Sequence, residues 1–537
     1  MGTPAKPRWI GRRQLGLAAV ASLTVTVLAA CGGSNSASTK TATGGGTFTF
    51  GLSSDPGNLD PQASAASNLY QMSFLAYDPL LSIDNSGKIQ SQLATAWKVS
   101  GKQVVLTMHK AITCSDGSAF TATTAAANVN YIADPKNKSP FAGVFIPAGA
   151  KATGDDSTGT VTIDLPSAAP FALNGLAGVP MVCQKAITDR SLLAHKTDGT
   201  GPYTLSTAVA NDHYTLTKRT GYTWGPNGAS TAAAGLPDSI NVRIIPNETT
   251  AANLLLSGQL NAAAITGPDV QRLQAAKLFA AATPSVSGEM WFNQAAGRPG
   301  ADQQVRLALT RALDLGQVEK VWTSGRGTPG TTLAANAPVA CPGDSVSSAL
   351  PSFALDAAKA ALDSDGWTAG SDGIRTKNGK PLAVTFLYNT QTGAAGSAAA
   401  ELAAGQWKQL GVKVTMKAQD ETAAVNTLFS TGTWDVAWEP LNVSSPDQLV
   451  GFMSGPVVPA GENFAHIKDP AYDALVAKAQ TMQGAAGCPQ WLAADSTLVS
   501  HADVIPFANQ VQQVFGKNAQ FAVVSGELQP TSIRMGG

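Results

Sequence analysis

The chain has 537 residues, of which only 13% are charged, and its 36 Lys and Arg residues balance its 36 Asp and Glu residues. A net charge of zero argues against a nucleic-acid-binding protein, which needs a basic face to displace counterions, and against a polybasic membrane-surface protein. Hydrophobic residues make up 44% of the chain, which excludes wholesale disorder. The length predicts two or three domains or lobes, and no apolar run reaches the roughly 20 residues that span a bilayer.

The N-terminus has the pattern of an export signal. Lys6, Arg8 and Arg12-Arg13 precede an uncharged stretch at 15–30 that is too short to span a membrane, which predicts a signal peptide over residues 1–30. The stretch ends in Leu28-Ala29-Ala30-Cys31, which resembles the lipobox of bacterial lipoproteins, so we expect lipidation of Cys31. An ordinary secretory signal is the alternative, and Arg12-Arg13 leaves twin-arginine export open.

Residues 31–46 form a predicted tether between the lipid and the fold. The stretch from Gly32 to Gly46 is rich in Gly, Ser, Thr and Ala and has no large apolar residue, which is typical of a flexible linker. Because each buried methylene of a lipid contributes about 0.8 kcal/mol, a diacyl group on Cys31 would give a stable anchor. The folded part is therefore expected to work outside the cell membrane and to be held close to it.

The mature chain alternates between two kinds of hydrophobic spacing. Apolar residues at every second position predict strands near 47–50, 104–108, 161–165, 214–216 and 240–244. Helical spacing predicts 249–260 with Thr249 or Thr250 as N-cap, 303–322 capped by Asp302, a helix from Asp356 to about Gly366, and 397–410 ended by Gly411, with a strand at 412–416 after it. Alternating strands and helices predict an α/β protein.

Four cysteines remain in the mature chain: Cys114, Cys183, Cys341 and Cys488. An even number in an exported chain predicts two disulfides, for which three pairings are possible. Four buried free thiols are the alternative. The sequence has no Cys-x-x-Cys, so a redox or zinc motif is not supported.

Motifs of known enzyme classes are absent from the sequence. It has no Gly-x-Ser-x-Gly, no His-Glu-x-x-His and no phosphate-binding Gly-x-x-x-x-Gly-Lys-Ser/Thr. Its five histidines are all more than four residues apart, so none has a metal-ligand spacing. We therefore expect no enzymatic activity, no cofactor and no metal.

A series of short motifs resembles the extracellular solute-binding proteins of family 5, the peptide and nickel class that feeds ABC importers. The resemblance runs from about Thr47 to about Phe515. The motifs are Asn58-Leu59-Asp60-Pro61, Tyr77-Asp78-Pro79-Leu80-Leu81, Gly87-Lys88-Ile89, Leu93-Ala94-Thr95-Ala96-Trp97, Ser115-Asp116-Gly117-Ser118, Gly199-Thr200-Gly201-Pro202-Tyr203, Phe292-Asn293, Ala312-Leu313-Asp314, Asp365-Gly366-Trp367 and Ile505-Pro506. Each motif is weak by itself, but their common order makes the resemblance specific.

The resemblance implies a two-lobed clamp of the periplasmic-binding-protein type (type II, large cluster C), with mixed sheets flanked by helices. Lobe I would cover residues 47–284, including a subdomain at about 63–196, and would be completed by a C-terminal return at 501–537. Lobe II would cover 285–500. The pairing Cys114–Cys183 and Cys341–Cys488 is favoured, because each bond then falls within one proposed lobe. A disulfide that closes a loop of this size contributes about 4 kcal/mol in the chain-entropy model.

The motifs that peptide-binding relatives use for a ligand's charged ends are not evident here. Those relatives carry an Asp shortly before a Pro in the second lobe, and this chain has Asn442-Val443-Ser444 ahead of Pro446. Dipeptide-binding relatives carry an Arg near 387–393, where this chain has Asn389-Thr390-Gln391-Thr392. Burying an unpaired end charge is costly, so a free dipeptide is disfavoured. A longer peptide, an oligosaccharide, another neutral polar solute or a nickel chelate stays open.

The loops that the family presents to the cleft supply the predicted ligand contacts. Tryptophan rings would stack on apolar or sugar surfaces, and amides and hydroxyls would orient the solute. The predicted contacts are Asn58, Asp60, Thr390, Gln391, Trp434, Trp438, Glu439, Asn442 and Ser444.

The sequence thus predicts a monomeric, lipid-anchored receptor that captures a small solute and passes it to ABC permease subunits in the membrane. Two other classes of function stay open. One is a secreted hydrolase that shares the export features, and the other is a surface co-receptor that uses the clamp without transport.

Overall fold

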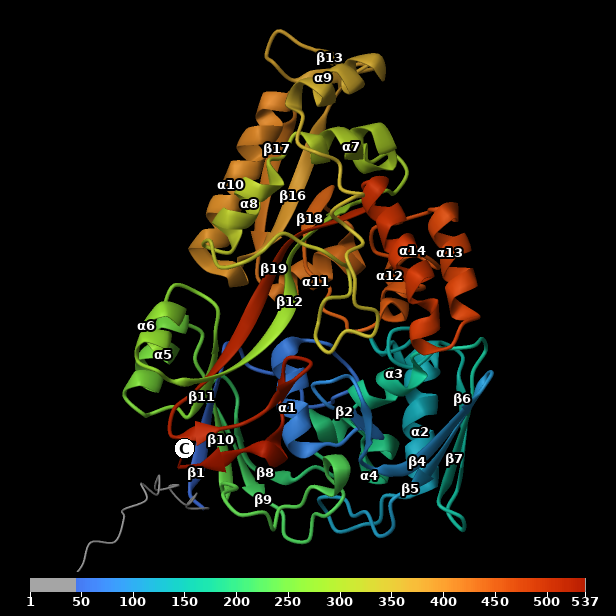
Figure 1. Ribbon diagram of the computed structural model, residues 1–537, viewed down its shortest axis with the longest axis vertical. Helices are drawn as coiled ribbons and strands as arrows, with labels where there is room; N and C mark the ends of the chain where they lie inside the picture. Colours follow the sequence, from blue (N-terminus) through green and yellow to red (C-terminus); the bar gives the residue numbers. More distant parts are fainter. Residues whose placement is uncertain (1–44, 537) are drawn as a thin grey trace, which may run out of the picture. The chain divides into compact units, whose positions relative to one another are not determined.

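The computed structural model describes residues 45–536, apart from the side chains of Gln391 and Thr422. The predicted signal peptide, the lipidation site Cys31 and the tether up to residue 44 lie outside the described residues. Strands and helices alternate, and helices flank mixed β-sheets (Figure 1), which confirms the predicted α/β class. Within residues 45–536 no helix is both long and apolar enough to cross a membrane.

A ten-stranded mixed sheet carries most of the long strands, in the order β17-β16-β18-β12-β19-β11-β1-β10-β9-β8. β1 pairs in parallel with β10 and β11, and β16 with β17 and β18, whereas the other neighbours are antiparallel. The strands are β1 (Thr47–Leu52), β8 (Tyr203–Val209), β9 (His213–Lys218), β10 (Ser239–Ile244), β11 (Ala262–Ile265), β12 (Phe279–Phe292), β16 (Ala383–Asn389), β17 (Lys413–Gln419), β18 (Val436–Trp438) and β19 (Val504–Gly516).

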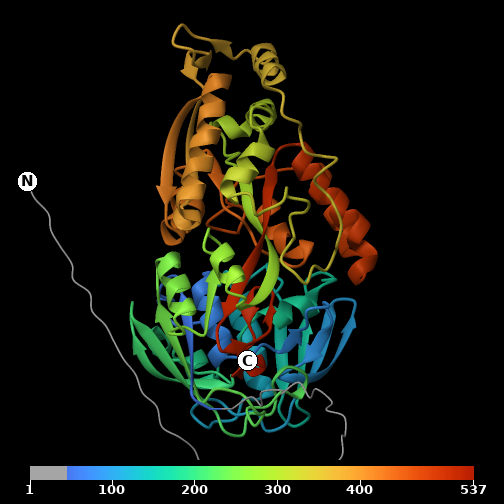
Figure 2. The same ribbon diagram turned by 60° about the vertical axis from the view of Figure 1, so that its left-hand side comes forward.

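The two longest strands, β12 and β19, connect the two lobes (Figures 1 and 2). They pair antiparallel from Phe279 opposite Gly516 to Trp291 opposite Val504, with register shifts on either side of Gly288. A Cβ atom on Gly288 would lie 2.4 Å from the ring of Phe507. Only glycine fits there, because the strand backbone approaches the ring too closely for a side chain.

A separate four-stranded antiparallel sheet, in the order β4-β5-β7-β6, builds the core of a subdomain. Buried Val104, Leu106, Val161 and Ile163 alternate with more exposed neighbours on β5 and β7 and pack with the helices around them. The elements are α1 (Ser67–Ala76), β2 (Leu81–Ile83), β3 (Ile89–Ser91), β4 (Ala94–Ser100), β5 (Gln103–Met108), α2 (Ala122–Ala133), β6 (Lys151–Asp155), β7 (Thr160–Asp164), α3 (Ala172–Gly178) and α4 (Gln184–Thr188).

The second half of the chain packs helices around β16, β17 and β18. Its core is rich in aromatic residues, including Trp322, Phe386, Trp407 and Trp438. Two helices, α5 (Glu248–Leu256) and α6 (Val270–Ala275), come before this half of the chain. The helices that follow are α7 (Gln303–Arg311), α8 (Leu315–Trp322), α9 (Leu355–Ser364), α10 (Gly393–Leu410), α11 (Glu421–Asn426), α12 (Val450–Met453), α13 (Pro470–Gln480) and α14 (Cys488–Ser500). A short sheet joins β13 (Thr368–Ala369), β14 (Arg375–Lys377) and β15 (Lys380–Pro381).

The predicted helix over 303–322 is wrong in one respect, because it is two helices. Asp302 caps α7 as predicted, through a bond from the Gln304 amide. The helix then ends at Arg311, and Asp314 starts α8 by accepting from the Gln317 amide. An Asp that finds a backbone N–H three residues on competes with continuation of the helix. Its side chain therefore breaks a hydrophobic pattern that is continuous in the sequence.

Other helix ends differ from the prediction by a few residues. Asn247, rather than Thr249 or Thr250, caps α5. Helix α9 starts at Leu355, so Asp356 lies in its first turn and is not its cap. Gly411 ends α10 in the left-handed conformation, with φ of 95°, as predicted.

Both favoured disulfides are present. Cys114 is bonded to Cys183, at a sequence separation of 69 residues, and Cys341 to Cys488, at a separation of 147 residues. The predicted pairing is therefore confirmed.

The Gly199–Tyr203 motif has a packing explanation. The Gly201 amide donates to the Ala76 carbonyl at the end of α1 over 2.9 Å. A Cβ on Gly201 would lie 2.4 Å from the Ala76 carbonyl carbon, and one on Gly199 would lie 2.4 Å from the Ala76 oxygen. The glycines allow this segment to lie directly against α1, which is where the cavity described below begins.

The C-terminal segment folds back onto the first lobe in two short antiparallel strand pairs, of which the inner one is a hairpin. One pairs β20 (Ala519–Gln520) with β23 (Arg534–Met535), and the other pairs β21 (Val523–Val524) with β22 (Glu527–Leu528). Phe521 packs edge-on against Phe48 and Phe279, with ring centroids 6.0 and 5.1 Å apart. This packing places β22 beside α1.

Candidate functional site

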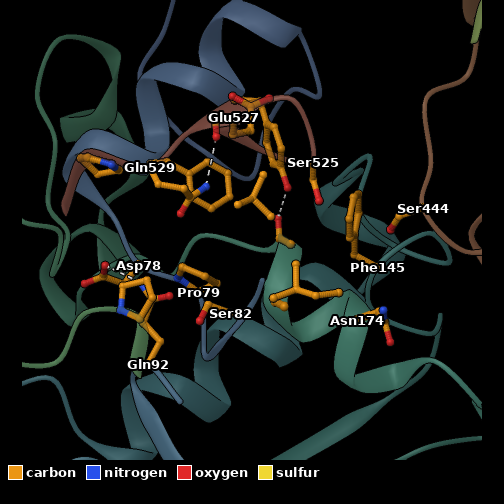
Figure 3. A pocket seen from close by; sticks show the side chains of 18 of the residues that line it. Asp78, Pro79, Ser82, Gln92, Phe145, Asn174, Ser444, Ser525, Glu527 and Gln529 are labelled. Atoms are coloured by element: carbon orange, nitrogen blue, oxygen red, sulfur yellow. Dashed lines mark hydrogen bonds between the residues drawn. The ribbon is translucent and has the colours of Figure 1, made fainter. Parts of the chain in front are cut away.

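A cavity lies where the subdomain, the C-terminal hairpin and a loop of the second lobe meet (Figure 3). It encloses about 870 Å³ of space not filled by atoms, with the open solvent at its mouth included. Four parts of the chain supply most of its lining, namely α1 with residues 78–92, α3 with Phe145, Asn336 with residues 442–448, and residues 524–531.

Aromatic side chains form one wall of the cavity. Tyr70 and Phe74 are four residues apart on α1 and therefore project from the same face of the helix, with their rings edge-on at 5.0 Å. The ring of Phe145 lies 6.5 Å from that of Tyr70. The Tyr70 hydroxyl donates to the Gly178 carbonyl at the end of α3 over 2.5 Å. This bond fixes the position of the Tyr70 ring between the two helices.

Asp78 lies at the base of the cavity with every acceptor position occupied. Its Oδ1 accepts from Gln92 Nε2 and the Tyr222 hydroxyl, at 2.7 and 2.9 Å. Its Oδ2 accepts from the Thr200 hydroxyl and Trp224 Nε1, at 2.9 and 3.1 Å. Burial raises the pKa of Asp78, and these four hydrogen bonds act against that rise.

Glu527 reaches the cavity from the C-terminal hairpin. Its Oε2 atom is buried and has no hydrogen-bond partner among the described residues. Burial raises the pKa of Glu527 to about 8, because a carboxylate in an apolar pocket loses the hydration that stabilises its charge. The same carboxyl is the second-largest cause, after burial, of a raised pKa at Tyr70.

The second lobe contributes a loop that is held by backbone and amide contacts. The Asn336 amide donates to the Val443 carbonyl at 3.1 Å. Gln448 Oε1 accepts from the amides of Ser444 and Ser445, each at 3.1 Å. Asn336 Nδ2 also donates to the Ser525 carbonyl at 3.1 Å, so the loop is tied to the C-terminal hairpin across the cavity.

A buried glutamate of β12 holds the chain just before this loop. The Glu439 amide donates to the Glu289 carbonyl at 3.0 Å, and Glu289 Oε2 accepts from the Leu441 amide at 2.9 Å. Trp291 Nε1 donates to the Glu439 carbonyl at 2.8 Å. Burial raises the pKa of Glu289 to about 8. The loop is therefore anchored on a strand that connects both lobes.

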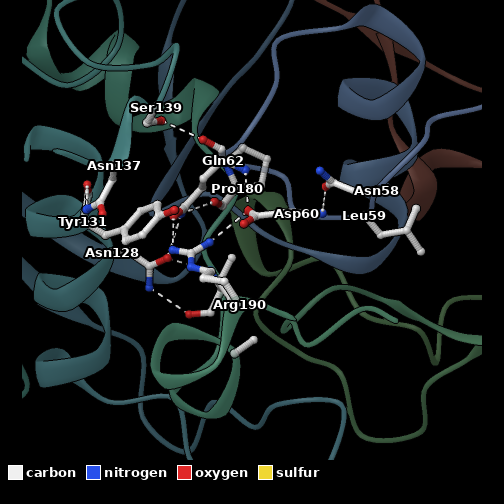
Figure 4. A network of polar contacts seen from close by, with 12 residues as sticks. Asn58, Leu59, Asp60, Gln62, Asn128, Tyr131, Asn137, Ser139, Pro180 and Arg190 are labelled. Atoms are coloured by element: carbon white, nitrogen blue, oxygen red, sulfur yellow. Dashed lines mark hydrogen bonds and ion pairs between the residues drawn. The ribbon is translucent and has the colours of Figure 1, made fainter. Parts of the chain in front are cut away.

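Two of the nine predicted contact residues, Asn442 and Ser444, line the cavity. Asn58 and Asp60 lie instead in a polar network between the subdomain and the rest of the first lobe (Figure 4). The Asn58 side chain accepts from the Asp60 amide at 2.8 Å, and Asp60 pairs with Arg190 at 2.9 Å. A ligand contact by either residue stays a prediction.

The two predicted tryptophans are buried in separate cores. Trp438 is 1% exposed and packs against Phe386, Phe507 and Trp322, with ring centroids 4.9, 4.7 and 5.4 Å away. Trp434 is 0% exposed. Neither lines the cavity, so their predicted stacking on a solute would need them to leave these cores.

The other three predicted contacts lie near one another in the chain's second lobe. Glu439 is part-buried, accepts from Asn389 Nδ2 at 3.4 Å, and has its pKa raised to about 8, chiefly by burial. Thr390 is exposed at the start of the short 3-10 helix Thr390–Thr392. The side chain of Gln391 lies outside the described residues.

The cavity also contains residues that the sequence did not single out as contacts. Asp78 and Pro202 belong to motifs that carried the family resemblance, so their order in the chain was a signal for the fold but not for the site. Tyr70 and Phe74 have a helical spacing that is equally typical of a core. Glu527 is an isolated acid in a short hairpin, and nothing around it in the sequence indicates a cavity.

One group of side chains, Asp469, His501 and Asp503, has ligand atoms within 4.8 Å of one another. Asp469 caps α13 and accepts from His501 Nδ1 at 2.7 Å. Asp503 accepts from Arg306 and Gln294 at 2.7 and 2.9 Å. These contacts join α7, α13 and the start of β19, and Asp503 Oδ2 is a buried atom without a hydrogen-bond partner among the described residues.

The structure as a whole is that of a two-lobed α/β binding protein, in which a part-enclosed cavity is the main chemical feature. The sequence profile of the bacterial extracellular solute-binding proteins, family 5 Middle, matches residues 88–455, which is more than half of the chain. The chain therefore belongs to the family 5 extracellular solute-binding proteins, as its motifs predicted. Members of this family are binding proteins rather than enzymes.

Individual relatives agree with this assignment. The chain is 26% identical to the periplasmic murein peptide-binding protein MppA of Escherichia coli (strain K12) over 490 residues, covering 85% of this chain and 86% of MppA. Two solved structures share the fold. One is the oligopeptide-binding protein AppA of Bacillus subtilis in complex with a nonapeptide (TM-score 0.78, 18% identity, covering 92% of this chain and 100% of AppA). The other is a substrate-binding protein of Microbacterium hydrocarbonoxydans complexed with 4-hydroxybenzoate hydrazide (TM-score 0.76, 23% identity, covering 91% and 99%).

Proposed function

We propose that this protein is the receptor of an ABC importer, which captures a peptide or a related small solute in the cavity and delivers it to permease subunits in the membrane. A lipid on Cys31 holds it at the outer face of the cell membrane. The receptor works as a monomer and releases its solute chemically unchanged.

The observation that carries the proposal is the origin of the cavity lining. Segments of the first lobe, the C-terminal hairpin and the 442–448 loop all contribute to it. A solute bound there contacts both lobes at once, so its binding energy favours one arrangement of the lobes. A permease that recognises this arrangement can tell a loaded receptor from an empty one.

The proposed lobe limits are those that the sequence suggested. Lobe I takes residues 47–284, with a subdomain at about 63–196, and the return at 501–537, and lobe II takes 285–500. The register shifts beside Gly288 lie in the first crossover strand close to the proposed boundary, which supports a hinge at this point.

Asn442 and Ser444 are the first ligand contacts that we propose, because they line the cavity from the second lobe. Asn58, Asp60, Thr390, Gln391, Trp434, Trp438 and Glu439 follow as contacts to be tested by substitution. A peptide is favoured over an oligosaccharide because MppA and AppA are described as binding a murein peptide and a nonapeptide.

Mass spectrometry of the solute that co-purifies with the mature protein tests the binding function. We expect a peptide or small polar solute that is displaced on unfolding and recovered unchanged. Asn442→Trp, which fills the cavity from its exposed side, should abolish retention, whereas Asn426→Trp on exposed α11 should not. A chemically converted solute, or equal retention by both variants, would contradict the proposal.

Anchoring and delivery need separate tests. Cys31→Ser should release the protein from the membrane fraction and abolish labelling with a radioactive fatty acid. Deleting the receptor should stop uptake of the identified solute by whole cells, and light scattering should give the mass of a monomer. Normal uptake in the deletion strain would favour a co-receptor that takes no part in transport.

A further inference from the structure

Two acids line the cavity, Asp78 and Glu527, and they differ in how far their oxygens are occupied. Among the described residues, no Lys, Arg or His lines the cavity with them. A carboxylate has about four lone-pair positions for hydrogen bonds. Asp78 receives four bonds from neighbouring side chains, so it has no position left for a solute.

Glu527, in contrast to Asp78, has a carboxyl oxygen whose acceptor positions no described residue occupies. Its buried Oε2 has no donor among the described residues, although Tyr70 and Gln529 also line the cavity. The Tyr70 hydroxyl donates instead to the Gly178 carbonyl. Gln529 Nε2 donates to the backbone carbonyl of Glu527, at 3.1 Å, and not to its carboxyl group. The protein therefore leaves this carboxyl group unpaired in a place where a solute would meet it.

Leaving a buried carboxyl unpaired is unfavourable, and such groups in folded proteins call for an explanation. A solute that supplies the missing donor removes the penalty on binding. This holds most strongly for a donor with a positive charge, since hydrogen bonds between charged groups are about twice as strong as neutral ones.

On the basis of the proposed solute-binding function, we propose that Glu527 is the specificity-determining acid of the cavity. It selects solutes that carry a protonated amine and, together with the absence of basic side chains around it, rejects anionic ones. The faces of Tyr70, Phe74 and Phe145 suit the apolar part of such a solute and can also favour a nearby cation.

An anionic solute would find no positively charged partner in this cavity. Its charge would be buried beside two acids, with no basic side chain among the described lining residues to balance it. The ammonium group that we propose has two chemical sources, the N-terminus of a peptide and a free organic amine. Both would bind Glu527 through the same contact, and probes of each kind distinguish them.

The binding of an amine to Glu527 is expected to depend on pH, and few other titratable groups lie near this carboxyl group. Tyr70 is the one titratable residue of α1, α3 has none, and the loop at 442–444 has none. Asp78 is the other acid of the cavity. Because burial raises the pKa of Glu527 to about 8, the empty cavity holds a proton at neutral pH. An amine binds the ionised carboxylate, so it displaces this proton, and its affinity rises as the pH is raised from 6 to 8.

The experiment uses the mature protein freed of its solute and two probe sets, a mixture of tripeptides and a mixture of C4–C10 primary alkylamines, each also in N-acetylated form. Retention is measured by mass spectrometry, and affinities of the retained members by calorimetry. We expect wild-type protein to bind free amines at least tenfold more tightly than their acetylated forms. Tripeptide-only retention identifies a peptide N-terminus as the source, and alkylamine retention identifies a free amine.

Glu527→Gln keeps the size of the side chain and removes its charge. It should bring free and acetylated probes to within about twofold of each other. Glu462→Gln is the matched control, because burial also raises the pKa of Glu462 and it lies outside the cavity lining. This control should keep the wild-type preference.

Wild-type protein alone gives an independent measurement if a variant folds poorly. Calorimetry at pH 6.5 in two buffers of different ionisation enthalpy should show release of about one proton for each amine bound. Amine binding without proton release, or a preference that survives in Glu527→Gln, would overturn the role of Glu527. Undiminished binding by Asn442→Trp would instead show that the cavity is not the solute site, which separates the failure of this inference from that of the proposed function.

Discussion

The polar network around Asp60 and the cavity around Glu527 each contain a buried acid. The two acids differ in whether the protein supplies hydrogen-bond donors to the carboxyl group. Asp60 Oδ1 accepts from Arg190 and from the Gln62 amide, at 2.9 and 3.0 Å (Figure 4). Gln62 accepts from Arg190 and donates to Asn128 and to the Pro180 carbonyl. In the cavity, by contrast, the Glu527 carboxyl has a buried oxygen without a donor.

Whether an acid has hydrogen-bond donors distinguishes structural residues from binding residues better than its membership in a family motif does. Asp60 belongs to one of the motifs that identify the family, and Glu527 belongs to none. The network pairs its acid and joins the subdomain to the first lobe, so a solute has no carboxylate to complete there. Its one buried side-chain atom without a partner among the described residues is Arg190 Nε. A place where the protein leaves a polar group unpaired is a place where a ligand can stabilise it.

The largest expected effect comes from breaking the network at its cation. Arg190→Ala leaves Asp60, whose side chain is 9% exposed, without its ion pair, and removes the guanidinium that lies 3.6 Å from the centre of the Tyr131 ring. We expect the free energy of unfolding to fall by about 3 kcal/mol, since removing one partner of a buried pair strands the other. Urea denaturation measures it. An unchanged midpoint would show that the network is not structural.

Asp78→Asn tests an acid of the cavity whose acceptor positions are all occupied by hydrogen bonds. The amide replaces one acceptor oxygen by a donor, which then faces donors that it cannot bind. We expect a loss of about 2 kcal/mol in the free energy of unfolding, from the donors left unpaired. Thermal and urea unfolding would measure it. Unchanged stability would mean that the four bonds to Asp78 are weaker than their distances suggest.

The sequence could predict much of the fold because local patterns determine it. Alternating apolar residues located β1, β5, β7, β9, β10 and β17, and Asp302 and Gly411 marked helix ends correctly. The break between α7 and α8 was missed because the apolar spacing runs through it, and only the bond from the Gln317 amide to Asp314 reveals a new helix start.

The site was less predictable, because it depends on contacts between distant segments. Asn442 and Ser444 were accessible through the family's order of motifs. Glu527 reaches the cavity because Phe521 packs against Phe48 and Phe279 and so turns the hairpin towards α1. No spacing within the sequence encodes that approach. Saturation of Asp78 likewise depends on Tyr222 and Trp224, which are more than 140 residues away in the chain.

Glu527→Gln should change stability in the opposite direction to Asp78→Asn. The pKa of Glu527 is raised from 4.5 to about 8 in the folded protein. The stability that the protonated form contributes is therefore complete below about pH 4.5 and is lost as the pH rises towards 8. We expect Glu527→Gln to raise the free energy of unfolding by about 1–2 kcal/mol at pH 8, a value reduced because Glu527 as a whole residue is only half-buried.

That gain should shrink as the pH falls towards 4.5 and disappear well below it, where the wild-type carboxyl is neutral in both the folded and the unfolded state. Urea unfolding between pH 4.5 and 8 measures the trend. Glu401→Gln, on the exposed face of α10, is the control and should show no comparable gain. A gain that is the same at every pH would assign the effect to packing rather than to charge.

The smallest expected effect on stability belongs to the loop that faces the cavity from the second lobe. Asn442 is exposed there and lines the cavity, so Asn442→Ala should change the free energy of unfolding by less than about 0.5 kcal/mol. If its amide binds the solute, the affinity should fall three- to tenfold, which corresponds to a hydrogen bond of about 1 kcal/mol. Calorimetry with the co-purified solute measures this, with Asn426→Ala as control.

Arg190→Ala, by comparison, should lower stability and leave the affinity of the folded fraction unchanged. The reverse pattern, with solute affinity lost at Arg190 and retained at Asn442, would place the binding site at the Asp60 network and reverse the comparison.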